Sequence, residues 1–195
     1  MNSSTDLYPS VKRLVEGKTA TGYDGQTVEV TGESSVNNLR MIRHLVETRQ
    51  ATQTLEVGLA YGASALTFLQ ALSTNNGDFS HTGIDPFQFS HLHGAGIRAI
   101  EDGGFKDHFQ FFEQPSCIAL PKMLSEGREF DIIYIDGSHL FEDAFMDAVF
   151  SIQMLRPGGL CLFDDCTDPH IAKVLQFLKT NYQQFVVSYD LHGII

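Results

Sequence analysis

Short apolar runs alternate with helical patterns along most of the chain. Such runs are typical of strands that are buried on both faces of a sheet. We expect strands at Thr54–Val57, His81–Asp85, Phe109–Glu113, Phe130–Asp136, Leu160–Asp165 and Phe185–Tyr189. We expect helices between them at Ala63–Leu72, Leu92–Glu101, Ser116–Ser125, Phe141–Leu155 and Pro169–Tyr182. This alternation predicts an α/β fold, a doubly wound and mostly parallel sheet with helices on both faces.

The first 33 residues differ from the rest in composition. They are polar and rich in Gly, Thr and Ser, with one strand-like piece at Thr27–Val30. We therefore expect a loosely structured arm over residues 1–33. The Ser34-Ser35 pair offers the N-cap of a first amphipathic helix. Because no internal repeat or long linker follows, residues 34–195 are expected to form a single domain.

The charge balance excludes one class of partner. The 195 residues include 24 Asp+Glu against 13 Lys+Arg, a formal net charge of −11. Such a chain repels polyanions, so we expect no nucleic acid as a partner. We expect no membrane either, since no apolar stretch approaches the roughly 20 residues that a membrane helix needs. The three cysteines lack C-x-x-C spacing, which predicts reduced packing residues in a cytoplasmic protein.

Each of the first five expected strands ends in a carboxylate. These residues are Glu56, Asp85, Glu113, Asp136 and the pair Asp164-Asp165. Ligands of doubly wound sheets bind outside the carboxyl ends of the strands. One or two such residues are readily explained as caps of the next helix. A carboxylate on every strand indicates a ligand site at this edge of the sheet.

The turn after the first strand contains two glycines, Gly58 and Gly62, in TLEVGLAYGASALTFL. Glycine lets the backbone approach a ligand, and the helix that follows presents free amide groups. The dinucleotide fingerprint G-x-G-x-x-G is absent, because Ala60 and Ala63 stand where it needs glycine. Asp85 at the end of the second strand could accept hydrogen bonds from both hydroxyls of a ribose. Together these features indicate a nucleotide-like ligand.

Three aspartates, Asp136, Asp164 and Asp165, would meet in one crevice if the fourth and fifth strands are neighbours. Crowded carboxylates raise one another's pKa unless a cation is present, and oxygen ligands favour Mg²⁺, with Mn²⁺ or Ca²⁺ as alternatives. His139 follows Asp136 closely and could act as a general base. Its alternative role is a hydrogen-bonded residue at the start of the next helix. Asp168 is the better N-cap of the last helix. The Asp164-Asp165 pair is therefore not needed as a cap and is available to bind a ligand.

Four segments carry a resemblance to a known family. In chain order they are TLEVGLAYGAS, HTGIDPFQ, FDIIYIDGSH and LRPGGLCLFDDC. Over about residues 34–182 the chain resembles class I S-adenosylmethionine (SAM)-dependent methyltransferases. The likeness is strongest to small bacterial members related to metal-dependent O-methyltransferases of the catechol and macrolide-sugar types. It implies a Rossmann-like methyltransferase fold, SAM and a divalent cation (Mg²⁺ first) as cofactors, and methyl transfer to a hydroxyl of a small molecule.

The same resemblance implies roles for individual residues. Ser64 would lie near the methionine carboxylate, Asp85 on the ribose and Ser116 against the adenine. The full cofactor-binding set would be Glu56, Gly58, Gly62, Ser64, Asp85, Ser116 and Asp136. The cation would be held by Asp136, Asp164 and Asp165, and His139 stands where the family places its catalytic base.

The end of the chain departs from the family pattern. The family sheet finishes with an antiparallel seventh strand, and only YDLHGII follows the sixth expected strand here. That last strand is therefore stunted, absent or supplied by a neighbouring subunit. Because an uncovered sheet edge favours pairing with another chain, we expect a homo-oligomer.

Two other functions stay open at the level of sequence. An NAD(P)-dependent oxidoreductase would share the fold, although the third glycine is missing and the Asp164-Asp165 pair would have no role. A SAM-binding domain without catalytic activity would keep the same ligands and serve in regulation or assembly. Fold-level likeness does not fix the methyl acceptor.

Overall fold

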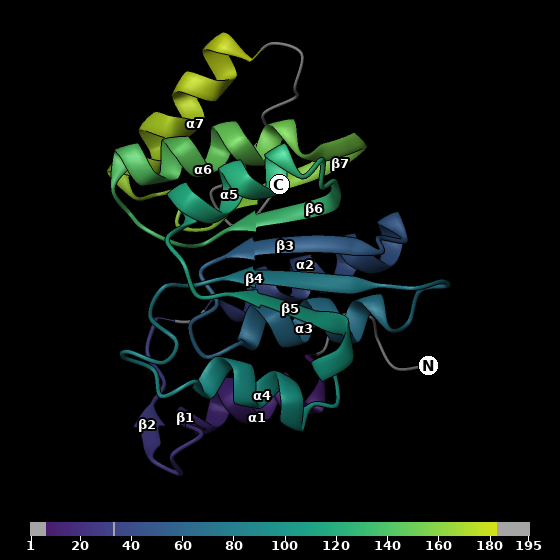
Figure 1. Ribbon diagram of the computed structural model, residues 1–195, viewed down its shortest axis with the longest axis vertical. Helices are drawn as coiled ribbons and strands as arrows, with labels where there is room; N and C mark the ends of the chain where they lie inside the picture. The colour runs from purple at the N-terminus through teal and green to yellow at the C-terminus, as the bar shows by residue number, and fades with distance from the viewer. Residues whose placement is uncertain (1–6, 33, 183–195) are drawn as a thin grey trace.

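The centre of the molecule is a five-stranded parallel sheet, described here from a computed structural model covering residues 7–32 and 34–182. The strand order is β5-β4-β3-β6-β7, and every neighbouring pair is parallel (Figure 1). The strands are β3 (Gln53–Val57), β4 (Ser80–Ile84), β5 (Phe109–Phe112), β6 (Phe130–Ile135) and β7 (Leu155–Phe163). The direction of winding reverses between β3 and β6, which is where doubly wound sheets bind ligands.

Helices cover both faces of this sheet (Figure 1). One face packs against α5 (Ser116–Ser125), α6 (Phe141–Gln153) and α7 (Pro169–Asn181). The other packs against α2 (Val36–Arg49) and α3 (Ala63–Leu72). Further out, α1 (Pro9–Gly17) and α4 (Ala95–Asp102) contact α3, and a short 3-10 helix, η1, spans Lys106–His108. The expected three-layer, doubly wound α/β fold is confirmed.

Strand β6 shows why the pattern of apolar runs predicted this fold. Its side chains alternate between the two faces, so Ile133 and Ile135 join the core under α5, α6 and α7. Ile132 and Tyr134 join the core under α2 and α3. A strand covered on both sides needs apolar residues at successive positions, which produces a continuous run instead of an alternation.

Two element boundaries differ from the expected ones for backbone reasons. Strand β7 begins at Leu155, before a register shift that contains Gly158 at φ +81°. Helix α4 begins at Ala95 and not at Leu92, since His93 and Gly94 have φ values of +52° and +69°. Such left-handed conformations interrupt a right-handed helix.

The expectation of a loose arm over residues 1–33 is wrong for the described part of that segment. Helix α1 is followed by an antiparallel hairpin of β1 (Thr19–Thr21) and β2 (Thr27–Glu29), and the latter confirms the strand-like piece near Thr27. Val11 and Leu14 are buried in a core shared with α3 and α4. The few apolar residues of α1 have helical spacing, and the polar composition around them masked it.

The strand expected at Phe185–Tyr189, and with it the question of a seventh strand, lies outside the described residues. No helix within the described residues is both long and apolar enough to cross a membrane. The cytoplasmic location and the homo-oligomer stay predictions.

Candidate active site at the carboxyl edge of the sheet

A cavity of about 1040 Å³ opens where β3, β4, β6 and β7 end. Its wall comes from the turn after β3, the loop after β4, the start of α5 and the loops after β6 and β7. Seven of the predicted site residues line it, namely Gly58, Asp85, Ser116, Asp136, His139, Asp164 and Asp165. Three others, Glu56, Gly62 and Ser64, lie outside its wall.

The glycine turn after β3 is packed directly against the end of β6. Gly58 has φ +92°, and a Cβ added there would lie 2.0 Å from the carbonyl oxygen of Asp136. The Asp136 N–H donates to the Val57 carbonyl at 2.9 Å, which holds the two segments together. Gly62, which caps α3, has φ +86° and approaches the Gly96 carbonyl. Both positions therefore require glycine.

Asp85 braces this turn from the neighbouring strand. Its Oδ2 accepts hydrogen bonds from the Leu59 and Ala60 amides at 3.2 and 3.0 Å, and its Oδ1 accepts one from the Phe87 amide at 2.7 Å. The side chain is buried but still borders the cavity. Asp85 thus shapes the turn, and its contact with a ribose stays a prediction.

Glu56 and Ser64 occupy the interior beneath the turn. Ser64 Oγ donates to Glu56 Oε2 at 2.6 Å, and Glu56 Oε1 lies 3.3 Å from His81 Nε2. Glu56 and His81 are both completely buried. The structure therefore ties these residues to the β4 side of the core. Their contact with SAM stays a prediction.

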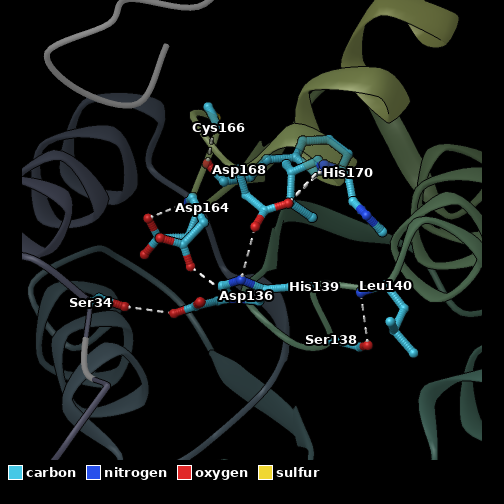
Figure 2. A network of polar contacts seen from close by, with 12 residues as sticks. Ser34, Asp136, Ser138, His139, Leu140, Asp164, Cys166, Asp168 and His170 are labelled. Carbon is cyan, nitrogen blue, oxygen red and sulfur yellow. Dashed lines mark hydrogen bonds and ion pairs between the residues drawn. The ribbon is translucent and has the colours of Figure 1, made fainter.

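The aspartates after β6 and β7 are held by side chains that no sequence pattern marked as part of the site, and Figure 2 shows one of them, Ser34, beside Asp136. Ser34 Oγ donates to Asp136 Oδ2 at 2.9 Å. Asn38 Nδ2 donates to Asp164 Oδ1 at 2.6 Å, and the Tyr134 hydroxyl donates to Asp164 Oδ2. The only local signal was Tyr134, a polar side chain inside an otherwise apolar stretch of strand.

The electrostatics of these aspartates follow from burial and crowding. Burial, followed by the charge of Asp164, raises the pKa of Asp136 to about 8. Burial and Asp164 also raise the pKa of Asp165, whereas the neighbouring His139 lowers it. These shifts have the direction expected for carboxylates that share a site.

His139 lies between two carboxylates at the mouth of the cavity. Its Nε2 is 2.9 Å from Asp165 Oδ2, and its Nδ1 is 3.6 Å from Asp168 Oδ2 (Figure 2). Asp165 has φ +49° and its carbonyl accepts the Asp168 amide at 2.7 Å, so this tight turn directs both side chains at His139. Asp168 also caps α7 through the His170 amide, as predicted.

The described residues contain no group of three or more His, Cys, Asp or Glu side chains placed to hold a metal ion. Asp136 and Asp164 are engaged by hydrogen-bond donors, and Asp165 is turned towards His139. The ligand set expected for a divalent cation is thus not assembled in this arrangement.

Residues outside the predicted set also shape the wall. Asp143, in the first turn of α6, lines the cavity. Burial raises the pKa of Asp147, behind this wall, to about 6, and the nearby Ser116 acts in the opposite direction. Cys117 is exposed at the cavity, so the expectation of a packing role is wrong for this cysteine. Cys161 and Cys166 do pack against the core under α6 and α7.

The fold and the cavity define a Rossmann-like α/β domain with a candidate ligand site at the switch point of its sheet. A family model described as a methyltransferase domain matches residues 55–166, which is more than half of the chain. The chain therefore belongs to this methyltransferase family, and the resemblance to class I SAM-dependent methyltransferases is confirmed.

Solved structures of O-methyltransferases share the fold. An O-methyltransferase from Bacillus cereus in complex with SAH has a TM-score of 0.69 and 14% identity, with 91% of this chain and 80% of that chain covered. TomG from Streptomyces achromogenes is involved in tomaymycin synthesis and was solved with SAM. Its TM-score is 0.65 and its identity 17%, with 94% of this chain and 79% of that chain covered. CalS11, a TDP-rhamnose 3'-O-methyltransferase, has a TM-score of 0.59 and 18% identity, with 72% of this chain and 68% of that chain covered. No curated protein matches the sequence.

Proposed function

We propose that this methyltransferase transfers the methyl group of SAM to a hydroxyl of a small molecule, with His139 as the general base. The observation that carries the proposal is that the glycine turn, Asp85 and His139 all line the same cavity. The residues expected to bind the cofactor and the expected base therefore share one site. Solved neighbours named as O-methyltransferases, with SAH or SAM bound in two of them, support both the cofactor and the oxygen acceptor.

The residues around His139 suit proton removal from a hydroxyl. Asp165 can only accept a hydrogen bond, so we assign the ring proton to Nε2. Nδ1 stays available, because its 3.6 Å separation from Asp168 exceeds a hydrogen bond. The acceptor proton moves to Nδ1, and the positive ring that results lies beside two carboxylates.

Bound SAM supplies a methyl group on a sulfonium, so that a new O–C bond forms as the S–C bond breaks and S-adenosylhomocysteine (SAH) leaves. The cavity wall has to align the acceptor oxygen for this in-line displacement and keep it next to His139. Gly58 and Ala60 border the same cavity, which lets backbone groups approach the cofactor closely.

Ligand-dependent melting tests this function against its two alternatives. SAH at about 100 times its dissociation constant should stabilise the chain by about 3 kcal/mol, a rise in Tm of roughly 5–10 °C. NAD should not shift the melt. Labelled SAM should then label hydroxylated small molecules. A shift with NAD alone would indicate the oxidoreductase, and SAH binding without transfer to any acceptor would indicate the inactive domain.

A divalent cation held by Asp136, Asp164 and Asp165 stays part of the proposal, and no step above depends on it. These residues border one cavity, and the charge of Asp164 contributes to the raised pKa of Asp136 and of Asp165, which favours a cation. As placed, however, they form no ligand group.

Metal removal decides the role of the cation. If it takes part, EDTA abolishes methyl transfer and Mg²⁺ restores it. Asp164→Ala should then lose the response to Mg²⁺ because one ligand is gone. Asp78→Ala, at an aspartate outside the cavity, is the matched control and should keep the response. Full turnover of the wild type in EDTA would contradict the metal prediction.

A further inference from the structure

Ala60 has a backbone conformation that residues with a Cβ rarely adopt. Its φ is +43°, in the left-handed region. It stands where the dinucleotide fingerprint G-x-G-x-x-G has its second glycine, the one that lets the backbone approach a bound pyrophosphate. Ala60 also lines the cavity, in the turn between β3 and α3. Because glycine is missing here, other contacts have to stabilise this part of the turn.

Gln88, in the loop after β4, supplies one of these contacts. The residue is completely buried. Its Nε2 donates to the Ala60 carbonyl oxygen at 2.6 Å and to Asp85 Oδ2 at 3.3 Å. The same Asp85 oxygen accepts the Ala60 N–H at 3.0 Å. Both backbone polar groups of Ala60 are therefore bonded to side chains that follow β4.

The packing around this contact leaves the Ala60 carbonyl little freedom. A Cβ added to Gly96, in the first turn of α4, would lie 2.5 Å from the Ala60 oxygen and 3.0 Å from Gln88 Oε1. A Cβ added to Gly62 would lie 2.9 Å from the Gly96 carbonyl oxygen. The turn, Gln88 and α4 thus fit together closely, and two glycines make room for the arrangement.

Packing alone does not explain a glutamine at this position. Gln88 Oε1 is buried and has no hydrogen-bond partner among the residues that the structure describes. Such an arrangement is unfavourable for a polar atom. An unbranched apolar side chain of similar length would fill the same space without this cost. What the glutamine adds is the pair of hydrogen bonds that its Nε2 donates.

We propose that Gln88 is a positioning residue for cofactor binding, which holds Ala60 in its left-handed conformation and keeps Asp85 against the turn. It thereby compensates for the missing glycine. This inference rests on the proposed function in taking SAM as a ligand of the cavity. Gln88 does not line the cavity, so it acts through Ala60 and Asp85. Its loss should therefore change the affinity for the cofactor and not the chemical step.

Gln88→Met removes both hydrogen bonds and keeps the length of the side chain. SAH binding should weaken by about tenfold, the effect of one or two lost hydrogen bonds. With labelled SAM, KM for SAM should rise while kcat at saturating SAM stays near the wild-type value. Gln70→Met is the matched control. Gln70 also has a buried Oε1 without a partner in the described chain, but its Nε2 donates to Ser10 and it does not line the cavity. This variant should keep the SAH affinity.

Ala60→Gly separates positioning from a general loss of stability. Glycine adopts a left-handed φ readily, so the turn should then depend less on Gln88. Gln88→Met should weaken SAH binding by about tenfold on its own, but by only about threefold when it is combined with Ala60→Gly. The remaining loss reflects the bond to Asp85. Denaturant unfolding of the wild type, the two single variants and the double variant gives the same comparison for stability, so a variant that folds poorly is still informative.

Three results would overturn the assignment. These are an unchanged SAH affinity in Gln88→Met, an equal loss with and without Ala60→Gly, and a fall in kcat with KM for SAM unchanged. If the wild type does not bind SAH, the proposed function fails, and the unfolding comparison then tests Gln88 alone. Strictly additive effects of the two substitutions on unfolding would overturn its role at Ala60. If SAH affinities follow the expected pattern and no acceptor is methylated, methyl transfer fails and the role of Gln88 stands.

Discussion

His139→Ala should lower methyl transfer by about 10²–10⁴-fold, the usual contribution of a general base, while SAH binding stays nearly unchanged. The imidazole is the one basic side chain held between Asp165 and Asp168 at the cavity. It does not brace the glycine turn, so its removal should not disturb the cofactor end. The measurements are kcat with labelled SAM and the dissociation constant of SAH.

A matched control comes from another histidine. His44 is exposed on α2 and does not line the cavity, so His44→Ala should keep full activity. Asp165→Asn keeps the ring but weakens its orientation, and kcat should fall by less than in His139→Ala with KM little changed. Wild-type turnover in His139→Ala would contradict the assignment of the base.

Gly58→Ala should destabilise the fold by about 3 kcal/mol or more and abolish SAH binding. The added Cβ would lie 2.0 Å from the Asp136 carbonyl oxygen, which cannot move without separating the ends of β3 and β6. The left-handed backbone, at φ +92°, adds strain for any residue with a Cβ. Denaturant unfolding and SAH titration measure the two effects.

Gly104→Ala separates the effect of the left-handed backbone from the effect of the close approach to Asp136. Gly104 has a similar φ, +82°, but an added Cβ there would meet nothing within 4 Å. This variant should lose only about 1 kcal/mol of stability and keep SAH binding. Equal losses in Gly58→Ala and Gly104→Ala would show that backbone conformation alone, and not the close approach to Asp136, makes glycine necessary.

The order of helices and strands was predictable because it depends on local patterns. The runs around Ile132 and Leu55 have the continuous apolar character of strands that are buried on both faces. Because parallel strands place their carboxyl ends at one edge, the positions of Asp85, Asp136 and Asp164 at that edge followed too. Helix α1 was missed, since its few apolar residues lie in a polar segment.

Partners of the site residues were not predictable in the same way. Ser34 and Asn38 reach Asp136 and Asp164 across more than 100 positions of the chain. No local pattern encodes such a contact, because it exists only once α2 packs beside the end of β6. The same holds for Asp143, whose place on the cavity wall depends on how α6 docks.

The sequence by itself determined the α/β class, the edge at which the site forms and the residue types that are present there. Tertiary structure decided how those side chains are used. It buried Glu56 against Ser64 and His81, turned Asp165 towards His139 and set Gln88 against the Ala60 carbonyl. The physical reason is that residue type and period are local properties, whereas the orientation and the partner of a side chain depend on segments that meet only in the folded chain.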